Sequence, residues 1–272
     1  GEDIKVNETL ADRYLLAPTT VLNKRSPEWS ALKRKWLNLG IKSELGRIEK
    51  INKDLRGSDK TNYKYLDRYK YTSAGVGNTV SIFDPVVCEI IYKWFCPLNG
   101  TILDPFAGGS VRGIVANYLG YKYTGLELRQ EQVDNNREQA LNILPIENQP
   151  QWYCGDSDKL LDDKWNLKFD FLFSCPPYAD LEVYSDLPDD LSNMDYKDFL
   201  SKYCSIIRKS LELLKPNSYA CVVVGDVRDK KTGFYYSLES DIIKIMQSNN
   251  IGLYQEIIIQ PPIGTKAFAA NN

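Results

Sequence analysis

The sequence contains no histidine and no Cys-x-x-Cys pair, although six cysteines are spread over its 272 residues. Without histidine the chain cannot assemble a Ser-His-Asp triad, and without clustered Cys and His it lacks the usual ligand sets for zinc. We therefore expect no metal cofactor. The cysteines are expected to be buried thiols of a protein in a reducing compartment.

Long apolar runs are also missing. No stretch approaches the roughly 20 residues that a membrane-spanning helix needs, and the N-terminal GEDIKVNETL does not have the form of a signal peptide. Because 43% of the residues are apolar, the chain can still bury a substantial core. We expect a globular, soluble protein of the cytoplasm, without a membrane partner.

The chain has no overall basic excess. Its net charge is −2, which by itself argues against a nucleic-acid binder. The distribution is uneven, because residues 1–75 carry 16 Lys and Arg against 10 Asp and Glu, whereas residues 76–272 carry 18 against 26. We expect 1–75 to be a basic N-terminal extension that contacts a polyanion, and 76–272 to be a separate domain. A solvated helical face would explain the charge equally well.

Two patterns stand out in the basic extension. Apolar residues recur at helical spacing around a basic run and predict an amphipathic helix that ends at Gly40; they are Trp29, Leu32, Trp36 and Leu39, with Lys33, Arg34 and Lys35 between them. Further on, KTNYKYLDRYKY (60–71) interleaves Tyr63, Tyr65, Tyr69 and Tyr71 with Lys60, Lys64, Arg68 and Lys70, a composition that suits base stacking and phosphate contact. Packing at a strand edge explains alternating tyrosines as well.

From residue 80 the chain alternates between strand and helix patterns. Expected helices cover 84–95, 108–120, 129–143, 195–214 and 237–250, and expected strands cover 100–105, 121–128, 151–154, 169–174, 219–226 and 253–260. This alternation with short connections predicts an α/β fold, a doubly wound and mostly parallel Rossmann-like sheet. In such sheets the ligand binds beyond the carboxyl ends of the strands.

Three strand ends carry residues suited to an adenosine-bearing cofactor. DPFAGGS (104–110) brings Gly108 and Gly109 to the start of a helix, where the backbone can approach a ligand closely, although a small-residue packing turn would look the same. Glu127 ends the next strand about 20 residues later and is placed to hold a ribose diol. Asp156 follows the third strand and can accept a hydrogen bond from an adenine amino group, or it can cap a helix.

The fourth strand end, DFLFSCPPY (170–178), is a rigid corner. Two successive prolines fix φ twice, remove two N–H donors and hold Cys175 in an extended conformation. The corner presents backbone carbonyls and the Tyr178 ring to something outside the chain.

Together these segments resemble the S-adenosylmethionine-dependent DNA amino-methyltransferases. DPFAGGS, GLEL, GDS and CPPY are similar to motifs I, II, III and IV of that family, and SIFDPVVCEIIYKWF (81–95) is similar to motif X, which gives the order X, I, IV. DRYLLAPTTVLNKRSPEWSALKRKW, LGIKSELGR and LEVYSD resemble a phage and prophage group, so that the likeness covers most of the chain. The resemblance implies a class I methyltransferase fold, S-adenosyl-L-methionine as cofactor and double-stranded DNA as partner.

The resemblance also implies a role for each motif residue. Glu127 would hold the ribose of the cofactor and Asp156 its adenine. The target base would bind in the corner formed by Cys175, Pro176, Pro177 and Tyr178. The methionine end of the cofactor would contact Phe83, Asp84, Asp104, Pro105, Phe106, Ala107, Gly108 and Gly109.

The corner suits a planar amine. An exocyclic amine is a poor nucleophile because its lone pair is delocalised into the ring, and hydrogen-bond acceptors facing its N–H groups free that lone pair. The rigid carbonyl of Pro176 is such an acceptor and needs no reorganisation, and Tyr178 offers a face for stacking a flipped base. The family has Asp, Asn or Ser where this chain has Cys175. Since a thiol is a weak acceptor, Ser174 is the candidate to replace it.

Several alternatives stay open. Adenine N6 is the preferred target, with cytosine N4 as the alternative. RNA or a protein glutamine amide could use the same corner, and a non-catalytic cofactor-binding module is also possible. Cys175 as a nucleophile for cytosine C5 methylation is disfavoured, because those enzymes have the cysteine directly after a proline and this chain has no histidine to manage protons.

Two expected parts have no counterpart in the sequence. No large target-recognition insertion follows CPPY, so recognition would fall to residues 1–75, to the 226–236 loop with Arg228, Lys230 and Lys231, or to a partner chain. A final antiparallel strand is missing after IIIQPPIGTKA, so the chain either continues past Asn272 or leaves the sheet edge incomplete.

Overall fold

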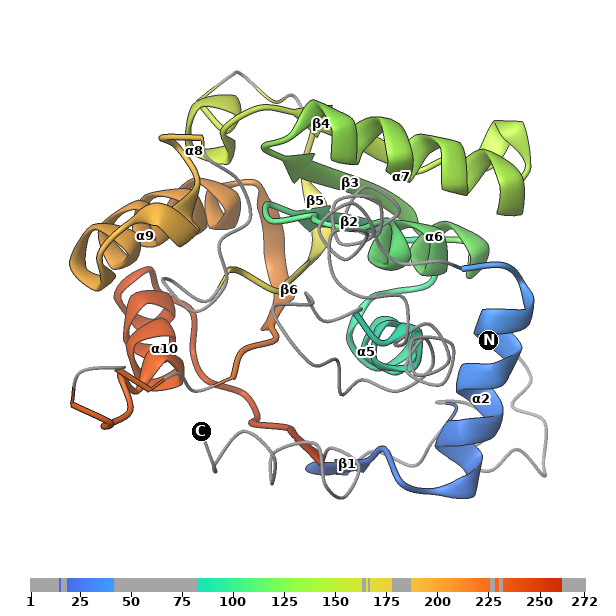
Figure 1. The fold of residues 1–272 in the computed structure, drawn as a ribbon, viewed down its shortest axis with the longest axis horizontal. Helices are drawn as coiled ribbons and strands as arrows, with labels where there is room; N and C mark the ends of the chain where they lie inside the picture. The colour runs from blue at the N-terminus through green and yellow to red at the C-terminus, as the bar shows by residue number, and fades with distance from the viewer. Residues whose placement is uncertain are drawn as a thin grey trace, which may run out of the picture.

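The computed structural model contains a parallel sheet with helices on both faces (Figure 1). It describes residues 15, 19–41, 83–162, 165, 167–177, 187–225, 228–229 and 232–260. The tyrosine-rich 60–71, Tyr178, Lys230, Lys231 and the expected boundary between residues 75 and 76 lie outside the described residues.

The central sheet has five strands in the order β4-β3-β2-β5-β6, and every neighbouring pair is parallel. The order reverses beside β2, so the carboxyl ends of β2 and its neighbours form a crevice of the kind that binds ligands in doubly wound sheets. The strands are β2 (Thr101–Asp104), β3 (Lys122–Glu127), β4 (Gln151–Cys154), β5 (Phe169–Ser174) and β6 (Leu214–Val222).

Helices cover both faces of this sheet (Figure 1). One apolar core includes Phe171 and Phe173 of β5 and the helices α5 (Pro85–Phe95), α6 (Val111–Tyr118) and α7 (Gln130–Ile143). The other core lies beneath α9 (Tyr196–Glu212) and α10 (Leu238–Ser248), next to the short helix α8 (Ser157–Leu160). The described residues also include two single-turn 3-10 helices, η2 (Ile146–Asn148) and η4 (Leu191–Asn193). The doubly wound fold predicted from the sequence is confirmed.

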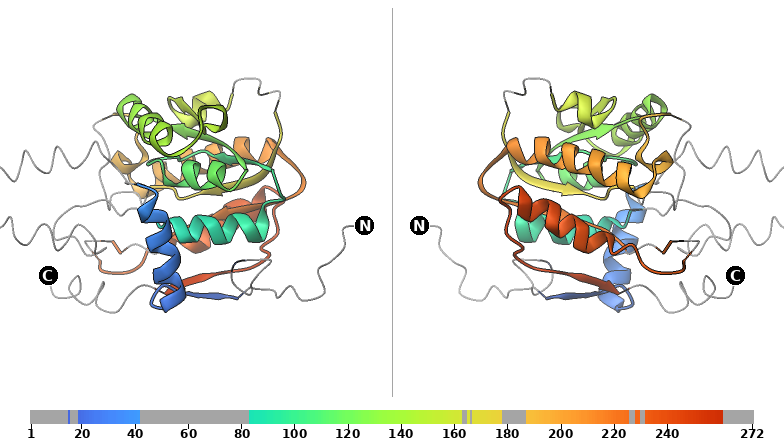
Figure 2. Two further views of the ribbon diagram at one scale, coloured as in Figure 1. Left: turned by 90° about the vertical axis from the view of Figure 1, so that its right-hand side faces the viewer. Right: turned by 90° about the vertical axis from the view of Figure 1, so that its left-hand side faces the viewer.

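The described part of the basic extension packs onto the domain. Ser26 caps α2 (Pro27–Asn38) by accepting a hydrogen bond from the Trp29 backbone N–H at 3.1 Å. The indole of Trp36 is buried and donates to the Glu89 carboxylate of α5 at 2.6 Å. Figure 2 shows α2 lying across one end of α5. The predicted amphipathic helix is confirmed, and it is part of the domain's packing.

The last predicted strand differs from the structure. Of residues 253–260, only Ile258–Gln260 form a strand, β7, and it pairs in parallel with β1 (Val21–Asn23) to make a separate two-stranded sheet. Within the described part of the chain, β6 has β5 as its one ladder partner. The second sheet brings the N-terminal segment beside the cavity described next.

Candidate functional site

Asp104 is the last residue of β2, and its carboxylate binds residues in and around the glycine-rich turn. Its carboxylate is fully buried and accepts hydrogen bonds from the Ser174 hydroxyl at 2.5 Å, the Tyr123 hydroxyl at 2.7 Å and the Phe106 backbone N–H at 3.1 Å. Arg112 Nε lies 2.6 Å from Oδ2, the oxygen that also accepts from Tyr123. Asp104 does not line the cavity described below, and its contacts connect β2, β3, β5 and α6.

Arg112 is the partner that the sequence analysis did not identify. Its guanidinium donates to the carbonyl oxygens of Phe106 and Ala107, the latter at 2.8 Å, and it lies 4.8 Å from the centre of the Phe83 ring. Gly108, with φ +52°, completes the turn in a conformation that favours glycine. A lone arginine in the small and apolar stretch GGSVRGIVA was the signal available in the sequence.

Glu127 lies at the end of β3 and faces the turn. Its carboxylate accepts hydrogen bonds from the Gly108 N–H at 3.0 Å and the Arg129 N–H at 3.1 Å, and Arg129 Nε lies 3.4 Å away. Burial raises the pKa of Glu127 above its ordinary value, although Arg129 and the two N–H groups oppose that shift. The carboxylate lines the cavity and is available to hydroxyl donors.

Asp156 follows β4 and has two functions at once. One carboxylate oxygen caps α8 by accepting from the Asp158 N–H at 3.1 Å, so the capping interpretation of the sequence is correct. The other oxygen lies 3.1 Å from the Lys202 ammonium of α9 and 3.7 Å from that of Lys159. Asp156 also lines the cavity, so its role as a cap does not remove it from the cavity wall.

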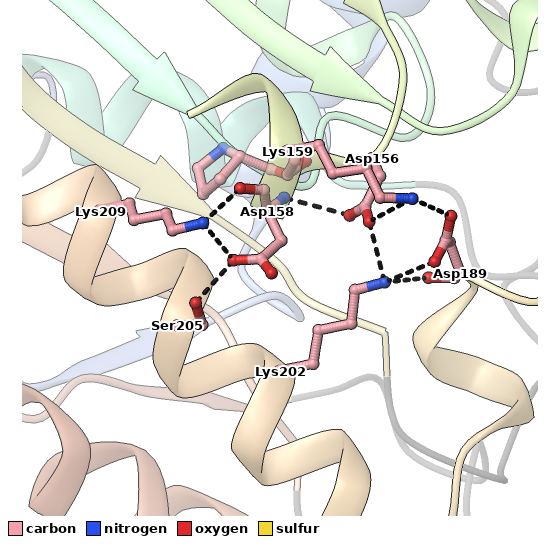
Figure 3. A network of polar contacts seen from close by, with 9 residues as sticks. Asp156, Asp158, Lys159, Asp189, Lys202, Ser205 and Lys209 are labelled. Carbon is pink, nitrogen blue, oxygen red and sulfur yellow. Dashed lines mark hydrogen bonds and ion pairs between the residues drawn. The ribbon is translucent and has the colours of Figure 1, made fainter. Parts of the chain in front are cut away.

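Lysines connect Asp156 and α8 to the segment before η4 (Figure 3). Lys202 lies between Asp156 and Asp189, and its ammonium donates to the Asp189 backbone carbonyl at 3.0 Å. Lys159 lies 2.8 Å from the Asp189 carboxylate, and this hydrogen bond lowers the pKa of Asp189. The Lys209 ammonium pairs with Asp158 at 2.8 Å on the other side of α8. The strand end is thus fixed by lysines that the sequence analysis had not selected.

The proline corner follows β5 directly. Cys175, Pro176 and Pro177 all line the cavity. Ser174 does not, because it is fully buried and its hydroxyl donates to Asp104. Ser174, the candidate to replace the missing acceptor, is thus turned toward Asp104 in this structure, whereas Cys175 lines the cavity.

These strand ends enclose one cavity of about 310 Å³. Among the predicted site residues that the structure describes, those that do not line it are Asp104, Ala107 and Ser174. The ones that do are Phe83, Asp84, Pro105, Phe106, Gly108, Gly109, Glu127, Asp156, Cys175, Pro176 and Pro177. Lys24, just past β1, and Ile259 of β7 also line it, so the small second sheet contributes to the cavity wall.

Among the described residues, no three Cys, Asp or Glu side chains are grouped so as to hold a metal ion. None of the helices described is long and apolar enough to cross a lipid bilayer.

Comparison with known proteins gives fold-level likeness only. No protein-family model matches the sequence, and no curated protein does. Among solved structures, TrmN from Thermus thermophilus is 17% identical with a TM-score of 0.41 over 55% of this chain and 40% of its own. A SAM-dependent methyltransferase from Agrobacterium tumefaciens is 17% identical, with a TM-score of 0.45; the match covers 63% of this chain and 51% of the other. Magnesium protoporphyrin IX methyltransferase from Synechocystis PCC 6803, with bound SAH, is 16% identical, with a TM-score of 0.42; the match covers 76% of this chain and 91% of the other.

The chain thus spans about half the length, or less, of the first two of these structures. With TM-scores below 0.5, these likenesses carry no argument about activity. The strand order itself identifies the fold as the Rossmann-like, mostly parallel sheet expected of a class I methyltransferase.

Proposed function

We propose that the chain is an S-adenosylmethionine-dependent DNA methyltransferase that acts on an exocyclic amine of a flipped-out base, with adenine N6 as the preferred target. One observation carries the proposal. The glycine turn, Glu127, Asp156 and the proline corner follow four different strands, and all of them line the same cavity. This shared lining supports a cofactor site and a target-base site that lie next to each other.

The residues at the strand ends fit an adenosine-bearing cofactor. Glu127 offers a carboxylate to the two hydroxyl groups of a ribose, because its present N–H partners leave acceptor positions unused. Asp156 offers its Lys202-paired oxygen to an adenine amino group. The Gly108–Gly109 backbone leaves room for close approach, since no side chain projects from either residue.

The proline corner suits the transfer step. Bound S-adenosylmethionine supplies an electrophilic methyl group on a sulfonium centre. The Pro176 carbonyl would accept a hydrogen bond from the amine and direct the nitrogen lone pair out of the base plane, toward the methyl group that the bound cofactor would supply. The methylated amine would release its extra proton to solvent, and the cofactor would leave as the thioether. Because two proline rings hold this carbonyl, it needs little reorganisation during the reaction.

The proposal that the substrate is DNA is also supported by basic residues outside the proline corner. Arg34 and Lys35 lie exposed on α2. In the loop after β6, the guanidinium carbon of Arg228 lies 3.8 Å from the centre of the Tyr235 ring. Such positions suit contacts to phosphates, which orient a duplex without reading its sequence. A partner chain, or the segments outside the described residues, would then supply sequence recognition.

The test is methyl transfer by the full chain. We expect labelled S-adenosylmethionine and unmethylated genomic DNA to give N6-methyladenine, detected by mass spectrometry after digestion to nucleosides. N4-methylcytosine would change the target base and leave the class intact. Pro176→Ala is the matched variant, and it should bind cofactor but lose at least about tenfold in transfer rate. Cofactor binding without any methylated DNA nucleoside, and with methyl groups in RNA or protein instead, would overturn the DNA assignment.

A further inference from the structure

Lys24 is a cation that the N-terminal segment places in the cavity wall. It follows β1, and its backbone N–H donates to the Gln260 carbonyl of the neighbouring strand at 3.2 Å. Its ammonium lies 3.0 Å from Asp84 Oδ2, and the side chain is 20% exposed. The described residues give this ammonium one anionic partner, although it has three donors. Donors therefore remain for a ligand.

Asp84 does not depend on Lys24 alone. Its Oδ1 accepts from the Val86 N–H at 3.1 Å, and its Oδ2 lies 3.3 Å from the Trp29 indole nitrogen and 3.4 Å from the Lys33 ammonium. Burial by itself would raise the pKa of Asp84, but Lys24 and Lys33 outweigh it and hold the pKa below its ordinary value. A carboxylate that stays ionised and a cation thus lie side by side in the wall.

The position of this pair relative to Asp156 matters. The Phe83 ring packs 5.7 Å from Phe173 of β5, so residues 83 and 84 lie on the β5 side of the cavity. Asp156 follows β4, at the opposite edge of the sheet from that side. A ligand with its adenine at Asp156 therefore extends its other end toward Lys24 and Asp84.

We propose that Lys24 binds the carboxylate of the cofactor's amino-acid end, beside Asp84, which faces the ammonium of the same group. This inference rests on the proposed function and deepens it. A zwitterionic head requires one group of each charge, and the Lys24–Asp84 pair supplies both in one wall of the cavity. The N-terminal segment thereby becomes part of the cofactor site.

Lys33 provides a matched control for this role. Its ammonium lies 3.4 Å from the same Asp84 oxygen, but Lys33 does not line the cavity. If the lysines only neutralise Asp84, replacing either one should have the same effect. If Lys24 binds the ligand, only its replacement should weaken binding.

The experiment compares S-adenosylhomocysteine with its decarboxylated analogue, which lacks only the carboxylate, by calorimetry on the full chain. The wild type should bind the intact ligand about tenfold or more tightly than the analogue, as expected for a hydrogen bond between charged groups. Lys24→Met should lose that preference by weakening the intact ligand alone, whereas Lys33→Met should keep it. Lys24→Gln replaces Lys24→Met if the latter fails to fold.

The outcomes separate this inference from the proposed function. A wild type that binds both ligands equally, or a Lys24→Met variant that keeps the preference, overturns the role of Lys24 alone. Equal weakening of both ligands in Lys24→Met also overturns it, because the loss would then not involve the carboxylate. A wild type that binds neither ligand overturns the proposed function and this inference with it.

Discussion

Asp104 and Arg112 form a buried ion pair directly beneath the glycine-rich turn, with 2.6 Å between Asp104 Oδ2 and Arg112 Nε. Their side chains are 0% and 6% exposed, so neither charge has much access to water. Arg112 also donates to two backbone carbonyls of the turn. The pair therefore fixes the shape of the turn that faces the cavity.

Arg112→Met should strongly destabilise the fold. Removing one partner leaves Asp104 charged and uncompensated in the interior, which typically costs about 3–5 kcal/mol. Urea denaturation of the variant measures this loss. Arg208→Met is the control, because Arg208 pairs with Glu212 in the open at 3.0 Å, and such an exposed pair is worth at most about 1 kcal/mol. Similar losses in the two variants would contradict a structural role for the buried pair.

Glu127 should make cofactor binding depend on pH. Its pKa is raised above 4.5 by burial, while ribose hydroxyls donate best to the ionised carboxylate. Affinity for S-adenosylhomocysteine should therefore fall as the pH drops through the folded-state pKa, by up to about tenfold per pH unit. Calorimetry at a series of pH values above the ordinary glutamate pKa measures the slope, and Glu127→Gln should abolish it.

The raised pKa of Glu127 also makes the stability of the fold depend on pH, but here the contribution of Glu127 falls as the pH rises. Between its ordinary pKa and the raised folded-state value, the folded protein holds a proton that the unfolded chain has lost. Its contribution to stability is complete below the ordinary pKa and is lost as the pH rises through the folded value.

For ligand binding, a pH dependence of affinity that survives in Glu127→Gln would assign that dependence to another group.

Two replacements of Asp156 separate its capping of α8 from its proposed contact with the cofactor. Asp156→Ala should weaken S-adenosylhomocysteine binding about tenfold and also lose the cap of α8, worth about 1 kcal/mol of stability. Asp156→Ser restores a capping oxygen but not the carboxylate, so stability should recover while binding stays weak. Calorimetry and thermal unfolding give the two readings. Wild-type affinity in Asp156→Ser would mean that Asp156 is a cap and nothing more.

Cys175→Ser should raise the rate of methyl transfer. A hydroxyl is a better hydrogen-bond acceptor than a thiol, and one improved hydrogen bond corresponds to about two- to tenfold in rate. Steady-state methyl transfer to DNA measures the change, and Cys204→Ser, a half-buried position that does not line the cavity, should leave the rate unchanged. Complete loss of activity in Cys175→Ser would instead indicate a cysteine nucleophile.

The sequence predicted the elements whose information is local. The strands ending at Asp104 and Ser174 are short runs rich in apolar residues and bounded by turn residues. The structure has these two strands, and the strand ending at Glu127, within one residue of the expected limits. The cavity-lining positions of Glu127 and Asp156 followed from the rule that parallel strands end at one edge. A periodic pattern with a clear stop is sufficient for such predictions.

What the sequence could not give depends on distant partners. The sequence predicted that Asp104 contacts the ligand, but in the structure its carboxylate accepts hydrogen bonds from Tyr123 and from Ser174, which is 70 positions away. β7 reads as one more strand of the main sheet, but its partner is β1. No local pattern distinguishes a strand that joins one sheet from a strand that joins another.

The pairing of β1 with β7 also has a consequence for the order of events during synthesis. Val21 and Ile258 are opposite each other in the ladder, so one strand leaves the ribosome long before its partner exists. At about 5–20 residues per second, the delay is on the order of ten seconds or more. Through that interval the wall containing Lys24 and Ile259 cannot close. A nascent chain should therefore acquire its affinity for ligand late and abruptly, after most of the central sheet has already formed.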